Sequence, residues 1–288
     1  MKMADILNGD PIIMENITSG IANAGGFEYT WRYMTTNYTR FQIATYGSAL
    51  LHLMSYILIA SPSIIFRYIP FMDRFKIQQK PLSGANEMKC FQLLLLNQLI
   101  IHVPFYLGAH FYCELANLPF SYETMPPWYV TLAQCFGCLV IEDTWHYFSH
   151  RLLHHKSIYK YVHKVHHTWQ APHGMVAECV HPIETILLGV GNMWGVLFFG
   201  THFILLWAWM FVRLLEVIDV HSGYNVPLNP LHLFPFYGGA KFHDFHHMNL
   251  KGNYAPTFIW WDKIFGTDIQ YKEYYRLKKE QEEAKKQK

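Results

Sequence analysis

The sequence predicts an all-α integral membrane protein with about four transmembrane helices in two hairpins, capped by a helical region rich in histidine. Of its 288 residues, 51% are hydrophobic and only 15% are charged, whereas about 25% of the residues of an ordinary soluble domain are charged. The apolar residues lie in long blocks, as membrane spans require. The 18 histidines are unevenly spread, and nine of them lie between residues 146 and 181.

Two apolar runs near the N-terminus predict the first hairpin. Residues 1–40 lack the basic region, apolar region and cleavage site of a secretory signal, so we expect later segments to enter the membrane. Residues 43–65 and 91–111 are each close to the roughly 20 residues that cross the hydrocarbon core. The positive-inside rule would place the basic loop between them in the cytosol. Its basic residues are Arg67, Arg74, Lys76, Lys80 and Lys89.

Residues 183–217 predict the second hairpin. This apolar stretch contains Gly189, Gly191, Asn192 and Gly195, which weaken helices, so we expect it to break there into two short helices. An even number of crossings would return the chain to the same membrane face, as a single site built from histidines on both sides requires. Residues 128–141 are also apolar but marginal for a full span, and whether they cross stays open.

These features divide the chain into three parts: an N-terminal segment (1–40), a membrane-embedded domain (41–272) and a charged C-terminal tail (273–288). Lys285 and Lys286 stand fourth and third from the C-terminus, as in a dilysine retrieval signal of the endoplasmic reticulum. An ordinary solvated tail is the alternative. Sequons at Asn16 and Asn37 would be glycosylated only if the N-terminus were lumenal.

Charge and cysteine content exclude other classes. A net charge of +2 without a basic stripe argues against nucleic-acid binding. The five scattered cysteines do not form a disulfide framework, which favours a reduced, cytosol-facing environment. Cys135 and Cys138 have CxxC spacing but no partner pair, so we interpret them as small packing residues rather than a metal or redox site.

Three histidine clusters carry the chemistry. Residues three or four apart project from one side of a helix, so each cluster can direct two or three imidazoles at a common point. Imidazole binds iron, copper and zinc, and this many rings would leave several unused around one metal, so two metals fit better. The clusters are His150-Arg-Leu-Leu-His154, His163-Lys-Val-His166-His167 and His243-Asp-Phe-His246-His247.

Other metal chemistries fit less well. No cluster has the glutamate that a zinc protease carries in HExxH. Carboxylate-bridged di-iron bundles use Glu-x-x-His motifs, whereas Glu142, Asp143, Glu178 and Glu184 lie outside the clusters. Two axial histidines of a haem would leave the repeated HxxHH pattern unexplained. The sequence therefore predicts a site with nearly all-histidine ligands.

Several residues near the clusters are further candidates. His221 and Asn225 lie four apart where the second hairpin returns to the surface, and both could face the metals. His146 lies one turn before His150 and could extend its face. His181 leads into the second hairpin, where a supporting role beside the ligands competes with a structural one.

These motifs resemble the fatty acid hydroxylase and sterol desaturase superfamily, and most closely its methylsterol monooxygenase branch. The resemblance covers most of the chain from about residue 40. Besides the clusters, it rests on Glu142-Asp-Thr-Trp-His-Tyr, Ile158-Tyr-Lys-Tyr, Asp219-Val-His221-Ser-Gly-Tyr and the run from Trp260 to Asp268.

The resemblance implies a di-iron centre at the cytosolic face of the endoplasmic reticulum membrane. Related hydroxylases have a second histidine where this chain has Asn225, which leaves the coordination of one iron open. The implied ligands are His150, His154, His163, His166, His167, His221, His243, His246 and His247.

The resemblance also implies an activity: oxygen-dependent oxidation of a sterol 4-methyl group through hydroxyl and aldehyde to carboxylate. Electrons from NAD(P)H would arrive through a reductase and cytochrome b5, because the chain has no dinucleotide fingerprint. Other sterol demethylation enzymes are further expected partners. Sterol desaturation, fatty-acyl or lipid hydroxylation, and a non-catalytic metal-binding lipid scaffold are the alternatives.

Overall fold

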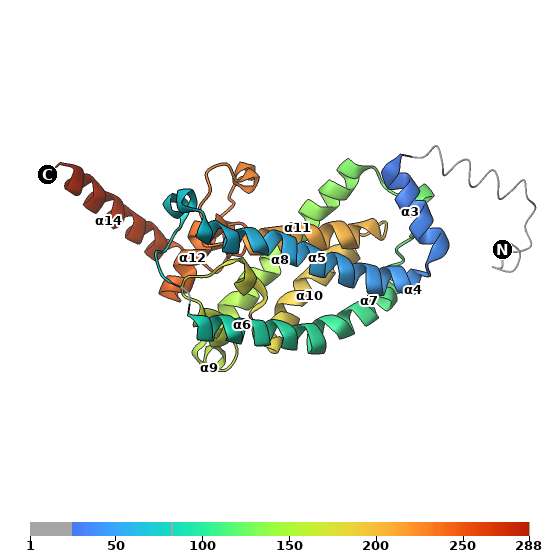
Figure 1. Cartoon of the computed structure of the whole chain (residues 1–288), viewed down its shortest axis with the longest axis horizontal. Helices are drawn as coiled ribbons and strands as arrows, with labels where there is room; N and C mark the ends of the chain where they lie inside the picture. Colours follow the sequence, from blue (N-terminus) through green and yellow to red (C-terminus); the bar gives the residue numbers. More distant parts are fainter. Residues whose placement is uncertain (1–24, 82, 288) are drawn as a thin grey trace, which may run out of the picture.

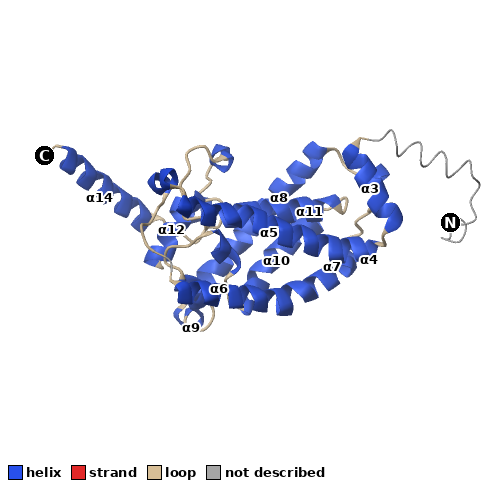
Figure 2. Ribbon diagram, viewed as in Figure 1, coloured by secondary structure: helices blue, strands red, loops and turns tan. Residues whose placement is uncertain are grey.

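The computed structural model describes residues 25–81 and 83–287, and within them the chain is helical (Figures 1 and 2). The β-pairing in these residues is limited to isolated bridges between Lys76 and Tyr224 and between Tyr237 and Phe258. The predicted all-α class is confirmed. The helices are α3 (Gly26–Asn37), α4 (Arg40–Gln42), η1 (Ile43–Gly47), α5 (Ser48–Ile65), η2 (Phe66–Tyr68), η3 (Pro70–Phe75), α6 (Gly84–Asn97), η4 (Gln98–His102), α7 (Val103–Leu115), η5 (Tyr122–Thr124), α8 (Trp128–Leu153), α9 (Lys156–Tyr159), η6 (His163–Thr168), η7 (Gly174–Glu178), α10 (Pro182–Phe199), α11 (Ile204–Val220), η8 (Pro230–Leu233), α12 (Gly239–Asn249), α13 (Trp260–Phe265) and α14 (Ile269–Lys286).

Three helical stretches of the described chain are long and apolar enough to cross a membrane: Arg40–Tyr68, Gly84–Leu115 and Pro182–Phe199. The first two contain the predicted spans of the first hairpin and extend beyond them. Each contains a five-residue π-helical turn: η1 lies near the start of the first stretch and η4 lies in the middle of the second. Only 17–28% of their most apolar windows is buried inside the protein, so most of this apolar surface is free to face lipid.

Two consecutive helices, α10 and α11, form in the region of the predicted second hairpin, but the break between them lies elsewhere than predicted. Helix α10 runs unbroken to Phe199 and the chain turns at Gly200, so the prediction that the glycines near residue 190 interrupt the helix is wrong. A Cβ on Gly191 would lie 2.8 Å from the Trp145 ring, and one on Gly195 would lie 2.7 Å from the backbone of α8. These glycines therefore allow α8 and α10 to approach closely.

Helix α8 is the central element. It has 26 residues and extends twelve residues beyond the predicted 128–141 segment. Its second half carries Glu142, Asp143, His146 and His150, all of them buried. It packs against both α10 and α11. The same helix therefore contacts the second pair of apolar helices and carries His150 of the histidine clusters.

The two ends of the molecule differ in character. Figure 1 shows α12 and α14 at one end of the long axis and α3 and α4 at the other. At the α3 end, Trp31 is buried and its indole donates a hydrogen bond to the Phe120 carbonyl at 2.8 Å. Helix α14 has no buried residue and carries Lys285 and Lys286 in its last turn. Asn37 ends α3 and is exposed, whereas Asn16 and most of the predicted N-terminal segment lie outside the described residues.

Candidate metal centre

Nine histidines gather in two neighbouring groups. Within each group, one ring nitrogen from every residue lies within 4.8 Å of the others. Eight of the nine side chains are buried and His154 is partly exposed. These are the nine residues that the sequence predicts as ligands. The first group is His150, His154, His163, His167 and His246, and the second is His166, His221, His243 and His247.

The HxxHH pattern divides each cluster between the two groups. On η6, His163 and His167 enter the first group and the intervening His166 enters the second. On α12 the division is reversed, with His243 and His247 in the second group and His246 in the first. The remaining three histidines lie at helix C-termini: His150 is in the last turn of α8, His154 caps α8 and His221 caps α11. The repeated pattern therefore places the two histidine groups side by side.

The hydrogen bonds of the ligands show that this site fits a cation. His150 donates from Nδ1 to the Tyr254 carbonyl at 2.8 Å, and His163 donates from Nδ1 to Glu184 at 2.8 Å. A neutral imidazole that donates from Nδ1 has a lone pair on Nε2. The Nε2 atoms of His150 and His163 nevertheless face each other at 3.0 Å. Two lone pairs cannot form a hydrogen bond, so a metal ion between them would satisfy both.

A second observation points the same way. His247 donates from Nδ1 to the Trp169 carbonyl at 2.9 Å, while its buried Nε2 has no hydrogen-bond partner among the described residues. His221 and His246 also donate from Nδ1 to backbone carbonyls, those of Val217 and Gly252, at 2.7 Å. Carbonyl acceptors behind the rings fix the tautomer that leaves Nε2 ready to bind a metal.

Burial keeps these imidazoles neutral. It lowers the pKa of His154 to about 4 and that of His221 to about 3. Burial, reinforced by the neighbouring histidines, also lowers the pKa of the cluster residues on η6 and α12 well below the usual value. Neutral imidazole is the form that coordinates a metal. The ligands are therefore in their binding form at neutral pH.

Glu184 holds His163 in place, a role that we did not predict from the sequence. Its carboxylate accepts the Nδ1 proton of His163 at 2.8 Å, and both side chains are only 1% exposed. Such a carboxylate orients the imidazole and raises its basicity toward the metal. The sequence does contain a feature that points to this role: Glu184 is the single charged residue of α10, at the start of an otherwise apolar helix.

The three further candidates lie outside both groups. His146 pairs with Glu142, with 2.9 Å between Nδ1 and Oε1. Asn225 is exposed, and its backbone N–H donates to the Phe75 carbonyl. His181 caps α10 and accepts from the backbone N–H of Ile183 at 3.2 Å. The structure therefore brings together the nine principal candidates and none of these three.

A cavity of about 540 Å³ leads from the metal centre into the apolar helices. Its walls come from α5, η4, α7, α8, α10 and α11, and are mostly apolar. Five of the nine histidines line one end, together with Glu142, His146 and Arg213. A volume of this size suits a single lipid-like ligand, within the usual range of 300–1,000 Å³ for small-molecule sites.

A second polar region of the cavity contains His52, His102 and Glu178. His52 lies between the Tyr106 hydroxyl, 2.8 Å from Nδ1, and Glu178, 3.0 Å from Nε2. The ring of His102 lies edge-on to His52 with 4.9 Å between centroids. Both nitrogens of His52 thus have protein partners, whereas Nδ1 of His102 is buried without one among the described residues.

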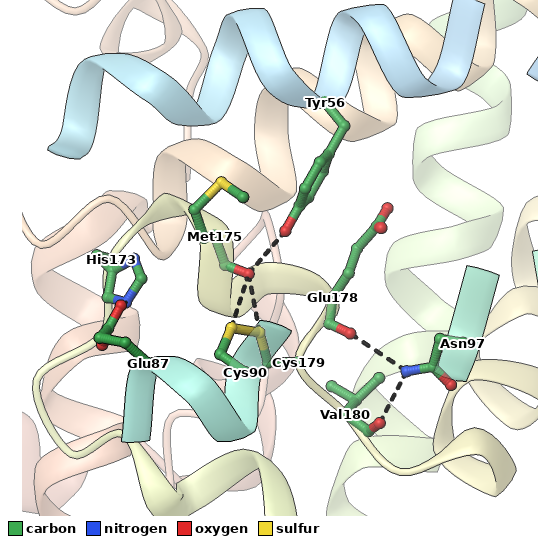
Figure 3. Close-up of a disulfide and its surroundings, with 9 residues drawn as sticks. All are labelled: Tyr56, Glu87, Cys90, Asn97, His173, Met175, Glu178, Cys179 and Val180. Atoms are coloured by element: carbon green, nitrogen blue, oxygen red, sulfur yellow. Dashed lines mark hydrogen bonds and ion pairs between the residues drawn. A yellow bond between two sulfur atoms is a disulfide. The ribbon is translucent and has the colours of Figure 1, made fainter. Parts of the chain in front are cut away.

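The loop that forms one side of the cavity is fixed at several points (Figure 3). Asn97 donates to the carbonyls of Glu178 and Val180, and the Tyr56 hydroxyl donates to the Met175 carbonyl at 2.7 Å. A disulfide joins the α6 residue Cys90 to Cys179. The sequence had favoured reduced cysteines, and that expectation does not hold for this pair. Cys135 and Cys138 are free and buried in an apolar cluster, as packing residues would be.

Comparison with known proteins identifies the family. The fatty acid hydroxylase family model matches residues 135–267, which include all nine clustered histidines. Methylsterol monooxygenase 1 of Gallus gallus is 54% identical over 96% of this chain and 95% of its own length. Methylsterol monooxygenase 1 of Rattus norvegicus is 56% identical over 86% of this chain and 85% of its own length.

Some relatives of lower identity are named for a different activity. Very-long-chain aldehyde decarbonylase GL1-8 of Oryza sativa subsp. indica is 37% identical over 86% of this chain and 94% of its own length. No solved structure matches the chain. The identity and coverage of the animal relatives show that this chain belongs to the methylsterol monooxygenase branch of the fatty acid hydroxylase family.

Proposed function

We propose that this chain is a membrane monooxygenase that oxidises the 4-methyl group of sterols, with two irons held by the nine clustered histidines. The observation that carries the proposal is the opening of both histidine groups onto one apolar cavity, in a chain 54–56% identical to proteins named methylsterol monooxygenase 1. The relatives named as aldehyde decarbonylases are more distant, at 37% identity. A sterol is therefore favoured over a straight-chain lipid.

The irons, when bound, would supply the activation of molecular oxygen that oxidation of an unactivated methyl group requires. The protein's contribution is to hold ligands, position the substrate and exclude water. Glu184 and the backbone carbonyls behind the imidazoles fix the ring orientations. The apolar walls admit a rigid hydrocarbon and keep water away from the reacting carbon. Three oxidations of that carbon give alcohol, aldehyde and carboxylate in turn.

Electrons for this chemistry would come from another protein. The proposed chain of donors is NAD(P)H, a reductase and cytochrome b5, because the sequence lacks a dinucleotide fingerprint. His154 is the one clustered histidine that is partly exposed. It marks the face on which the electron donor would approach the metals.

The proposed topology has two hairpins, with α11 as the fourth span beside the three apolar helices. Helix α10 starts near the metal ligand His163 and α11 returns to the ligand His221, so the pair crosses twice. The basic loop after α5 lies beside the same site, since the Ile77 N–H donates to the Gly223 carbonyl. The positive-inside rule then favours a cytosolic metal centre. The lysines at the end of α14 support residence in the endoplasmic reticulum membrane.

The test is oxidation of a 4,4-dimethylsterol by microsomes that contain the chain, NADPH and iron. His166 and His167 are adjacent but belong to different groups, so His166→Ala and His167→Ala should each lose one metal and abolish oxidation. His155→Asn is the matched control, because His155 is exposed and only caps α9, a role that asparagine also fills. Failure of the intact chain to oxidise the sterol, although iron is bound, would refute the sterol assignment.

A further inference from the structure

Glu142, His146 and Arg213 form a polar group in the cavity wall next to the clustered histidines. Glu142, His146 and the ligand His150 follow one another at one-turn spacing on α8. The rings of His146 and His150 lie 5.7 Å apart. Arg213 of α11 reaches across to Glu142, with 2.9 Å between Nη2 and Oε1. Glu142, His146 and Arg213 all line the cavity beside the metal centre.

The hydrogen bonds of His146 leave one nitrogen free. Two groups approach Nδ1: the Glu142 carboxylate at 2.9 Å, which can only accept, and Nη2 of Arg213 at 3.1 Å, which can only donate. Because Nη2 also lies 2.9 Å from the Glu142 carboxylate and can donate there instead, we assign the imidazole proton to Nδ1. Nε2 then has a lone pair, and it has no hydrogen-bond partner among the residues that the structure describes. Since the ring lines the cavity, this nitrogen can accept a hydrogen bond from a bound molecule.

The sterol substrate has one group that can donate this hydrogen bond. A sterol carries a hydroxyl group on C3, and the methyl group to be oxidised is on the adjacent carbon, C4. When the methyl group points at the metals, the hydroxyl must therefore also lie beside them. The second polar region does not meet this need: the rings of His52 and His102 lie against each other and Tyr106, and among the described residues neither contacts one of the nine clustered histidines.

We propose that His146, held in place by Glu142 and Arg213, accepts a hydrogen bond from the 3-hydroxyl group and so fixes the C4 methyl group at the metal centre. This inference rests on the proposed sterol activity and adds the residue that positions the substrate. The 3-hydroxyl does not change while C4 is oxidised three times. The same hydrogen bond therefore retains the alcohol and the aldehyde until the carboxylate is formed.

The experiment compares three substrates: a 4,4-dimethylsterol, its 3-deoxy analogue and its 3-oxo analogue. The intact enzyme should prefer the 3-hydroxy compound by roughly 10- to 100-fold in kcat/KM, because each analogue lacks the hydroxyl donor and leaves a polar group unpaired in a largely apolar site. His146→Ala should lose most of this preference and release alcohol and aldehyde early. His146→Gln carries both a donor and an acceptor, so it should accept the 3-oxo compound better than the intact enzyme does.

His52→Ala is the matched control, because it also removes a buried cavity histidine that pairs with a glutamate. It should lower activity on all three substrates alike and preserve the ratios. Iron content is measured for every variant, which separates loss of positioning from loss of metal. Equal oxidation of 3-hydroxy and 3-deoxy compounds by the intact enzyme, or unchanged ratios in iron-loaded His146 variants, would overturn the inference. Absence of any oxidation by the intact enzyme would refute the proposed function instead.

Discussion

Glu184→Gln tests how strongly the carboxylate that pairs with His163 affects the metal affinity of the site. Glu184 accepts the Nδ1 proton of His163 at 2.8 Å in surroundings where each side chain is only 1% exposed. Glutamine can still accept this hydrogen bond, but it removes the negative charge that polarises the imidazole. Hydrogen bonds to charged groups contribute about 1.5–3 kcal/mol. Because solvent does not screen this pair, we expect metal affinity to fall by a factor of about 10 to 100.

The assay is iron retention in detergent against a graded series of chelator concentrations, with sterol oxidation measured on the same samples. Activity should recover when iron is supplied in excess, because the ligands themselves remain. Glu87→Gln is the matched control. Glu87 also pairs with a buried histidine, His173, at 3.1 Å, but His173 belongs to neither ligand group. Equal iron retention in Glu184→Gln and Glu87→Gln would refute the reasoning.

Two further predictions concern stability. Gly195→Ala should lower the free energy of unfolding by about 1–3 kcal/mol, because the new Cβ would lie 2.7 Å from the Cα of Cys138. Gly189→Ala should leave it unchanged or raise it, since nothing lies within 4 Å of that position; thermal unfolding in detergent compares the two. Iron-free protein should lose stability as pH falls from 6.5 toward 4, because His154, with a pKa of about 4, and His221, with a pKa of about 3, take up protons only after unfolding. Each contributes about 1.4 kcal/mol per pH unit in that range, so an unfolding temperature that does not change with pH would contradict the assignment.

Spacing predicts the eight histidines of the three clusters because the information is local, whereas the family resemblance adds His221 to the implied ligands. Each HxxHH cluster fixes its histidines on one short helix, and spacing alone shows which rings can converge. Spacing does not show that each cluster serves both metals, since that division depends on how η6 and α12 face each other. It also cannot show that His146 lies outside both histidine groups. His146 is on the same face of α8 as His150, and its contacts with Glu142 and Arg213 can be seen only in the structure.

The errors have a common physical cause. Glycine was interpreted through its helix propensity, which predicts a break in α10 near residue 190. In the structure, Gly191 and Gly195 lie where α8 passes closest, and packing overrides propensity. The Cys90–Cys179 disulfide was missed for a similar reason. Its cysteines are 89 residues apart in the sequence and meet only because the loop around η7 packs against α6.

Helix α8 makes the membrane-embedded packing and the metal centre mechanically dependent on each other. Cys138 and Trp145 contact the glycines of α10, while Glu142, His146 and His150 line the cavity on the same helix. A shift of α8 at the glycine contacts would therefore move both the proposed substrate anchor and a metal ligand. Closely packed protein interiors transmit such displacements. Substitutions at Gly195, far along the sequence from any histidine cluster, should consequently change which carbon of the sterol reaches the metals as well as the stability of the fold.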